Sequence, residues 1–357
     1  MLPMTSDRHS SLFNAIADLV MCHSPSGVEQ EVNRYLLDRL QTLGVEHWQD
    51  EADNIIARIP GDQAEGATVP NRPGAIAITA HKDEIGGIVK GLSPQGRVEV
   101  RKLGGSFPWV YGEGVVDLLG DHHTLSGILS FGSRHVSHES PQKAQQEGKA
   151  VQWETAWVET KSTPETLAAA GIRPGTRMVV GKHRKRPFAL GDYIASYTLD
   201  NKASIAILLA LAERVQRAAV PVYLVFSAKE EVGAVGALYF SQRHKLSELI
   251  ALEICPLSRE YPIQSGPIPV LLAEDGYGLY DETLTQKLAQ AANQRQIPVQ
   301  IATITSFGSD GSIAMKFGHV PRAACLSFPT DNTHGYEIAH LSAIDRCIDI
   351  LEQYIST

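Results

Sequence analysis

The feature that most constrains this fold is an alternation of short apolar runs with helical segments after Gly191. The runs are rich in branched residues, which is typical of buried strands, and they cover residues 222–227, 249–254, 299–304 and 323–328. Helices are predicted over residues 201–217, 283–296, 311–317 and 339–354. Because alternating strands and helices build a sheet with helices on both faces, we predict an α/β fold with a mostly parallel sheet.

The first part of the chain adds a helix and a strand to this domain. Ser26 and Glu29 have the S-x-x-E spacing of a capping box, so we expect a helix to begin there. Apolar residues follow at helical spacing as far as Leu43, which gives this helix one apolar face. Residues 75–80 form a β-rich run that predicts a buried strand ending at His81.

Residues 87–186 differ from both flanking segments. Short apolar stretches alternate there with Gly, Pro and charged breaks, and a helix is expected only at residues 164–170. Several short strands with turn signals predict a small all-β sandwich or barrel. We therefore expect an α/β domain formed by residues 1–86 and 187–357, interrupted by a β-rich insertion at residues 87–186.

Composition narrows the possible partners and compartment. Lys and Arg number 32 and Asp and Glu 40, so the net charge is −8, which argues against a nucleic-acid-binding protein. The most apolar stretch, residues 203–211, is shorter than the about 20 residues that span a bilayer, so we expect no membrane association. The four cysteines have no C-x-x-C spacing, which favours free thiols in a reducing, cytoplasmic compartment.

Acidic residues and histidines gather where the predicted strands end. The segments that contain them are His81–Glu84, Leu199–Lys202, Lys229–Gly233, Leu252–Cys255 and Asn332–Gly335. Each has an ordinary structural explanation alone: Asp200 is a plausible helix N-cap, and Glu230-Glu231 fits a solvated helix N-terminus. Glu253 is harder to explain in this way, because an unpaired carboxylate in an apolar strand is costly. Since α/β sheets bind ligands at the carboxyl ends of their strands, we expect these segments to converge on one site.

Two imidazoles with several carboxylates suit Zn²⁺, Co²⁺ or Mn²⁺ and suit Ca²⁺ poorly. The ligands are too many for one tetrahedral ion and are sufficient for two, provided that one carboxylate bridges them. Such a pair lowers the pKa of a shared water and polarises a carbonyl, and a further carboxylate must accept the proton of the water. The adjacent Glu230 and Glu231 fit this division, because one would hold metal while the other acts as base.

The sequence resembles the tetrahedral (TET-type) metallo-aminopeptidases, a family with two metal ions that includes glutamyl and deblocking aminopeptidases. The resemblance runs almost end to end. Its motifs stand at Ser24–Glu29, Ala80–Gly86, Leu103–Gly105, Gly171–Gly175, Leu199–Lys202, Glu230–Gly233, Thr330 and His334. The turn at residues 308–311 reads Gly-Ser-Asp-Gly, where the family has Gly-Thr-Asp-Ala.

The resemblance implies a metal-ligand set. His81 would bind one ion, Asp200 would bridge the two, and Glu231 and His334 would complete the second site. The family usually has Asp as the remaining ligand of the first ion, and here that position is Glu253. A glutamate places its carboxylate one methylene further from the backbone, so the metal spacing or the choice of metal could differ.

The resemblance also implies chemistry and assembly. Glu230 would be the general base, and Asp83 would buttress His81 and fix its tautomer. The two divalent ions would be Zn²⁺ or Co²⁺, and the reaction would remove N-terminal residues from short peptides. The insertion would serve oligomerisation, and twelve subunits would form a hollow tetrahedron that admits only peptides.

Two alternatives stay open at this point. One keeps the metals and the fold but acts on non-peptide amides, as an amidase or deacylase. The other is a catalytically silent oligomer with a binding role, and Glu253 in place of Asp is its best support. Metal content and a substrate panel separate these alternatives from the aminopeptidase.

Overall fold

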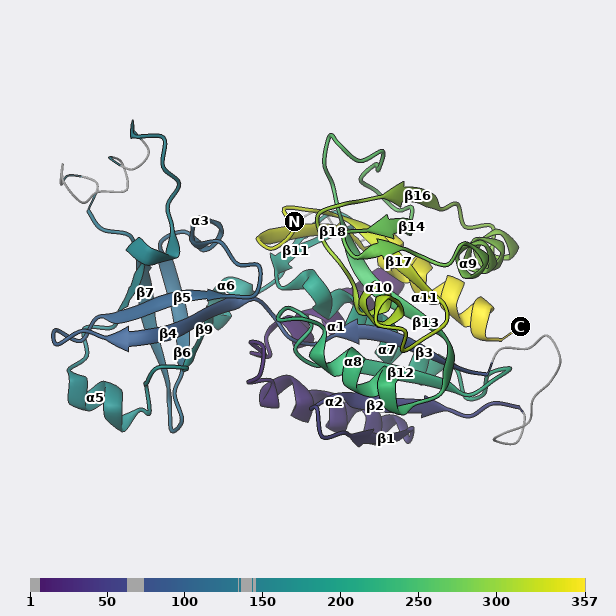
Figure 1. Ribbon diagram of the computed structural model, residues 1–357, viewed down its shortest axis with the longest axis horizontal. Coiled ribbons are helices and arrows are strands. Elements are labelled where there is room, and N and C mark those ends of the chain that lie inside the picture. Colours follow the sequence, from purple (N-terminus) through teal and green to yellow (C-terminus); the bar gives the residue numbers. More distant parts are fainter. Residues whose placement is uncertain (1–6, 63–73, 134, 136–142, 144–145, 357) are drawn as a thin grey trace. The chain divides into compact units, whose positions relative to one another are not determined.

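The chain divides into two compact units in the computed structural model, which describes residues 7–62, 74–133, 135, 143 and 146–356. One unit combines the residues before Glu84 with those after Arg186, and it is built on a mixed sheet covered by helices. The other unit, Glu84–Arg186, is built on a closed barrel (Figure 1). The predicted fold class, α/β with a small all-β insertion, is confirmed, but the sheet is mixed rather than mostly parallel, because antiparallel strands flank its parallel centre.

The sheet of the first unit has a parallel centre and antiparallel flanks, in the order β1-β2-β12-β3-β13-β17-β18-β11-β10. The central parallel strands are β12 (Val222–Ser227), β3 (Ala75–His81), β13 (Leu246–Pro256) and β17 (Ala323–Asp331). The flanking strands of this order are β1 (Glu46–Gln49), β2 (Ile55–Ile59), β18 (Tyr336–His340), β11 (Tyr193–Tyr197) and β10 (Phe188–Leu190). A branch on β17 contains β14 (Val270–Asp275), β15 (Gly278–Leu279) and β16 (Gln300–Thr303).

Both faces of this sheet are buried, because successive side chains of a strand point to opposite sides. In β13, Ile250 and Leu252 join one hydrophobic cluster while Leu249 and Ala251 join another. The first cluster is covered by α1 (Asp7–Val20), α2 (Gln30–Leu43), α7 (Leu199–Arg214), α9 (Glu282–Gln294) and α11 (Leu341–Ile355). The second is covered by α8 (Val235–Arg243) and α10 (Asp310–Lys316). Among the described residues, no helix combines the length and the apolar character needed to cross a bilayer.

The predicted capping box at Ser26 and Glu29 is wrong. Helix α2 begins at Gln30, and the Glu29 side chain makes no capping hydrogen bond. Ser26 instead donates its hydroxyl to Asp83 at 2.6 Å, and Glu29 accepts a hydrogen bond from the Lys82 ammonium. Both side chains therefore bond to the segment that follows β3, and Glu29 also accepts the Gly27 N–H at 3.0 Å, so the reciprocal bonds of a capping box are not made.

The second unit is a barrel of antiparallel strands in the closed order β4-β5-β8-β7-β6-β9. Its strands are β4 (Gly86–Leu92), β5 (Val98–Leu103), β8 (Trp157–Glu159), β7 (Thr124–Ser130), β6 (Gly114–Leu119) and β9 (Arg177–Val180). Its short helices are α3 (Pro108–Tyr111), η1 (Trp153–Thr155), α5 (Pro164–Ala169) and α6 (Lys182–Lys185). Thr163 caps α5 by accepting a hydrogen bond from the Thr166 N–H, which accounts for the helix expected at residues 164–170.

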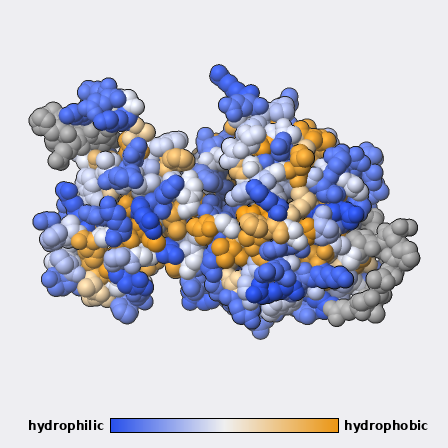
Figure 2. Space-filling view, in the orientation of Figure 1, coloured by the Kyte–Doolittle hydropathy of each residue, from blue (hydrophilic) through white to orange (hydrophobic). Residues whose placement is uncertain are grey.

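Both units carry exposed apolar side chains. Phe107 and Trp109 are 56% and 63% exposed on the barrel, and Leu279 and Phe317 are 69% and 62% exposed on the α/β unit. Figure 2 shows apolar areas on the visible face of each unit.

Candidate metal centre

The topology brings the acidic and histidine segments to one edge of the sheet. β3, β12, β13 and β17 are parallel, so their carboxyl ends meet at the same edge. β11 is antiparallel to β18, which is antiparallel to β17, and β11 therefore ends at this edge too. His81 ends β3, Glu253 lies near the end of β13, and the other candidates occupy the segments after β11, β12 and β17. The predicted convergence is thus a direct consequence of strand direction.

Asp200 lies between the two histidines. Its Oδ1 is 3.0 Å from Nε2 of His81, and its Oδ2 is 3.4 Å from Nε2 of His334. Asp200 and His81 are buried, at 8% and 2% exposure, whereas the His334 side chain is 34% exposed. Each oxygen of one carboxylate thus faces a different imidazole, which is the arrangement that a bridging ligand needs.

Three glutamates surround this central group. Nε2 of His81 is 3.9 Å from a carboxylate oxygen of Glu230 and 3.9 Å from one of Glu253. Nε2 of His334 is 3.7 Å from Oε1 of Glu231. Ligand atoms of His81, Asp200 and Glu231 all lie within 4.8 Å of one another, so they could hold a metal ion.

Asp83 connects the segments that carry these side chains. It is fully buried, and its carboxylate accepts hydrogen bonds from the backbone N–H groups of Glu230 at 2.9 Å and Glu231 at 3.3 Å. It also accepts the hydroxyl of Ser26, and its Oδ1 is 3.5 Å from Nδ1 of His81. The neighbouring Lys82 side chain pairs with Glu29 instead. Asp83 therefore orients the adjacent glutamates through its carboxylate, and the His81 ring through its backbone carbonyl, which lies 3.2 Å from Nδ1, with the carboxylate beside it.

The pKa values of the carboxylates in the cluster shift in opposite directions, although burial acts to raise all of them. Burial raises the pKa of Glu231 to about 7, although His334 acts to lower it, and it raises the pKa values of Glu230 and Glu253 well above the usual range. For Asp200 burial also acts to raise the pKa, but the hydrogen bonds to His334 and His81 outweigh it and the pKa falls. Asp200 is thus the carboxylate held most firmly in its charged form.

The chemistry of this donor set fits divalent transition metals. Imidazole nitrogens and carboxylate oxygens are the ligands that Zn²⁺ and Co²⁺ share. Burying so many carboxylates together is unfavourable unless positive charge compensates them. Glu253 places a carboxylate oxygen 3.9 Å from Nε2 of His81, so a donor is present on this side of the cluster.

Two buried acids at this edge were not assigned by sequence analysis. Asp310 accepts the hydroxyl of Ser227 at 2.5 Å through Oδ2, its Oδ1 has no hydrogen-bond partner among the described residues, and burial raises its pKa to about 6. Glu337 accepts the backbone N–H groups of Asp200 and His334, each at 2.9 Å. Burial and the charge of Asp200 raise the pKa of Glu337 to about 8. Two sequence features could have pointed to these residues. One is the acid in the turn at residues 308–311, and the other is the acid three residues after His334.

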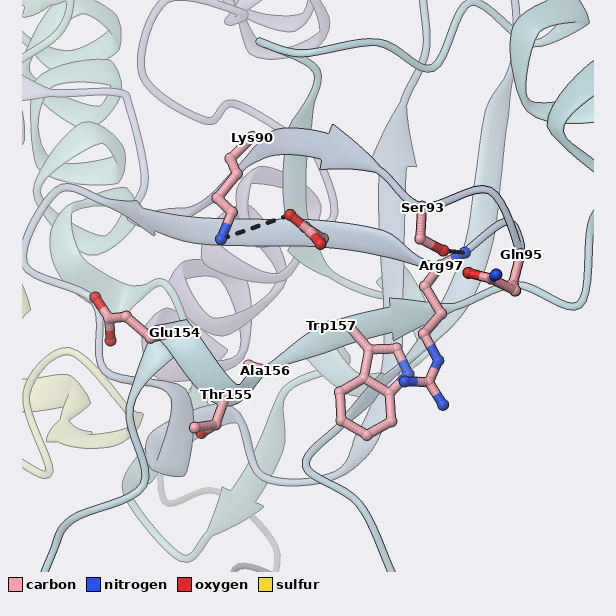
Figure 3. Close-up of a pocket in the computed structure, with 9 residues that line it drawn as sticks. Lys90, Ser93, Gln95, Arg97, Glu154, Thr155, Ala156 and Trp157 are labelled. Atoms are coloured by element: carbon pink, nitrogen blue, oxygen red, sulfur yellow. Dashed lines mark hydrogen bonds and ion pairs between the residues drawn. The ribbon is translucent and has the colours of Figure 1, made fainter. Parts of the chain in front are cut away.

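The barrel unit contains a pocket of about 470 Å³, but its lining is of a different kind (Figure 3). Lys90 pairs with Glu99 at 3.5 Å, and both side chains are 49% exposed. The Arg97 guanidinium lies 4.6 Å from the centre of the Trp157 ring. The lining residues include no histidine, and the charges of this ion pair are solvated, so the sheet edge is the candidate site.

Proteins of similar sequence and solved structures of similar fold match this chain over almost its whole length. The chain is 25% identical over 362 residues to the Bacillus subtilis protein named "Putative aminopeptidase YhfE", and the match covers 99% of each chain. An aminopeptidase from Desulfurococcus kamchatkensis superposes with a TM-score of 0.85 at 21% identity, covering 98% of this chain and 95% of that one. The Pyrococcus horikoshii TET1 peptidase superposes with a TM-score of 0.84 at 20% identity, covering 96% of this chain and 99% of that one.

The family model for M42 glutamyl aminopeptidases matches residues 54–350, which is most of the chain and includes every candidate residue at the sheet edge. The resemblance inferred from the sequence motifs is confirmed by this match. The chain therefore belongs to the M42 glutamyl aminopeptidase family, and with it to the aminopeptidase hydrolases.

Proposed function

We propose that this protein is a binuclear metal-dependent aminopeptidase that removes N-terminal residues from short peptides. The observation that carries the proposal is the Asp200 carboxylate, whose two oxygens face His81 and His334 at 3.0 and 3.4 Å. Membership in the aminopeptidase family supports the reaction class. The two-ion site and the roles of individual residues are the specific content of the proposal.

Each ion would have its own ligand set around the shared Asp200. His81 and Glu253 would complete the first set, and Glu231 and His334 would complete the second. When bound, two divalent ions, Zn²⁺ or Co²⁺, supply Lewis acidity toward the scissile carbonyl and lower the pKa of a nucleophilic water.

Glu230 would act as the general base. Its carboxylate lies 3.9 Å from Nε2 of His81, and a carboxylate placed beside the ion site suits a group that must accept a proton and then release it. Glu230 takes a proton from the attacking water and delivers it to the leaving amine. Asp83 would be a positioning residue, because it holds the backbone of Glu230 and Glu231 and faces the His81 ring.

The test combines metal content with a substrate panel. The protein loaded with Zn²⁺ or Co²⁺ should hold close to two ions per subunit and should hydrolyse aminoacyl-anilides and short peptides. Hydrolysis of N-acyl amino acids in preference to these substrates would favour the amidase or deacylase. Fewer than two ions together with no hydrolysis would favour a silent oligomer.

We also propose that the protein self-associates, as a dodecamer in which the barrel unit supplies subunit contacts, and that it works in the cytoplasm. The TET1 peptidase of P. horikoshii assembles into a tetrahedron or an octahedral shell, and exposed Phe107 and Trp109 give the barrel apolar surface for contacts. All four cysteines are buried, and Cys255, Cys325 and Cys347 are free thiols, which suits a reducing compartment. Light scattering should show a smaller particle when residues 87–186 are removed, and an unchanged particle would contradict this role for the barrel.

A further inference from the structure

Glu337 connects two segments of the candidate site that are far apart in sequence. It lies in β18, which pairs with β17 on one side and with β11 on the other (Figure 1). Its Oε2 accepts the N–H of Asp200, which follows β11, and its Oε1 accepts the N–H of His334, which follows β17. The residue is 1% exposed, so water does not compete for these bonds. A single carboxylate therefore clamps the backbones of both residues.

The clamp requires a carboxylate rather than any polar side chain. Both oxygens of the Glu337 carboxyl group accept a hydrogen bond, and metal ions bound beside it would favour its ionised form, whereas the amide of glutamine has one acceptor and one donor. Glutamine at this position would turn an NH₂ group toward one of two backbone N–H donors. One of the two backbone hydrogen bonds would then be lost, and the distance between Asp200 and His334 would no longer be held.

The backbone of His334 independently indicates that this spacing is held. Its φ is 61°, in the left-handed region that residues with a Cβ adopt infrequently. Such a conformation persists where surrounding contacts determine it. The bond from its N–H to Glu337 is one of those contacts, because it fixes the peptide that precedes the His334 side chain.

We propose that Glu337 is a positioning residue that sets the distance between Asp200 and His334 and thereby preforms the second of the two ion sites. The inference rests on the proposed function, because it takes these two residues as ligands. Glu337 holds them through the backbone and leaves their side-chain oxygens and nitrogen available. Its removal should weaken one ion selectively.

The experiment measures binding of Zn²⁺ to the metal-free full-length protein in competition with a chromophoric chelator. Glu337→Gln should bind the second ion, which has two ligands held by Glu337, roughly 10–100-fold more weakly, the usual effect of losing a partner that orients a ligand. The first ion shares only Asp200 with that set and keeps His81 and Glu253, so its binding should weaken clearly less. Glu337→Asp keeps the charge but is too short for both bonds, so it should fall between the wild type and Glu337→Gln. Peptidase activity of Glu337→Gln should recover as the Zn²⁺ concentration is raised.

Glu248 provides the matched control. It is also a fully buried glutamate. It lies near the end of β13 that is remote from Glu253 and the candidate site, where it pairs with Lys287 at 2.7 Å. Glu248→Gln should lower thermal stability and leave both ions bound as in the wild type. The clamp would be overturned if Glu337→Gln and Glu337→Asp bound each ion with the same affinity as the wild type. It would also be overturned if Glu248→Gln showed the same selective loss. A wild-type protein that binds fewer than two ions would instead overturn the proposed function.

Discussion

The two units of this protein differ in how far their buried carboxylates are compensated by neighbouring donors and cations. In the barrel, buried carboxylates have donors beside them: Glu84 pairs with Lys185, and Asp117 accepts hydrogen bonds from Ser126 and from the Lys182 N–H. At the sheet edge, carboxylates exceed the cations around them, and burial raises the pKa of several. The difference separates charges that stabilise a fold from charges gathered to hold something else. The second pattern is the one that a metal centre requires.

Glu230 is the residue whose substitution should have the largest effect. Glu230→Gln should retain both ions and lose roughly 10²–10⁴ in kcat, the usual contribution of a positioned acid–base group. Metal analysis and steady-state rates on an aminoacyl-anilide measure the two effects separately, and Glu231→Gln is the control. If Glu230→Gln loses metal while Glu231→Gln keeps it, the two roles are exchanged.

Substitutions of Glu253 test whether the excess negative charge at the sheet edge binds the first ion. Glu253→Ala should weaken binding of that ion at least about tenfold, since it removes one charged ligand beside His81. Glu253→Asp should have a milder effect, because it keeps the carboxylate and withdraws it by about one bond length. The measurement is metal stoichiometry at a fixed free-metal concentration. Two ions and full activity in Glu253→Ala would mean that the first site has another donor.

Substitution of Lys185 tests whether the buried charges of the barrel stabilise the fold and have no part in metal binding. Lys185→Met removes the ammonium from a carboxylate that is 1% exposed, which should lower the free energy of unfolding by roughly 3–5 kcal/mol. The double variant Glu84→Leu/Lys185→Met should recover most of that loss, because neither charge is then buried. Denaturant titration measures stability, and the metal content should be unchanged in both variants. A loss of metal would show that charge in the barrel also supports the site.

The pH dependence of the metal-free protein gives the smallest and most specific effect. The folded-state pKa is raised from 4.5 to about 7 for Glu231 and to about 8 for Glu337, so the folded protein binds more protons than the unfolded chain between about pH 5 and 8. Stability should therefore fall as pH rises through this window, by up to about 1.4 kcal/mol per pH unit for each proton.

Metal should reverse this trend, because its ligands must be deprotonated and binding is favoured as pH rises. Thermal unfolding with and without Zn²⁺ at several pH values checks both signs. A metal-free protein that becomes steadily more stable from pH 5 to 8 would contradict the raised pKa values. Glu231→Gln should flatten the metal-free curve.

Strands and their ends were predictable from the sequence because both are local properties. The apolar run before His81 and the runs at residues 222–227 and 323–328 correspond to β3, β12 and β17. Short strands such as β18 and β11 were missed, because pairing partners rather than hydrophobic runs define them. The Ser26–Glu29 motif was misassigned for a related reason, since its side chains bind Asp83 and Lys82 across the fold.

The sequence by itself determined the family, the fold class and the set of acids and histidines at strand ends. Only the tertiary structure decided how Asp200 faces two imidazoles, and that Glu337 holds the backbones of Asp200 and His334. The physical reason is the distance along the sequence over which each kind of interaction acts. Hydrophobic periodicity acts within a few residues, whereas these hydrogen bonds join positions brought together by the order and direction of strands, which no local pattern encodes.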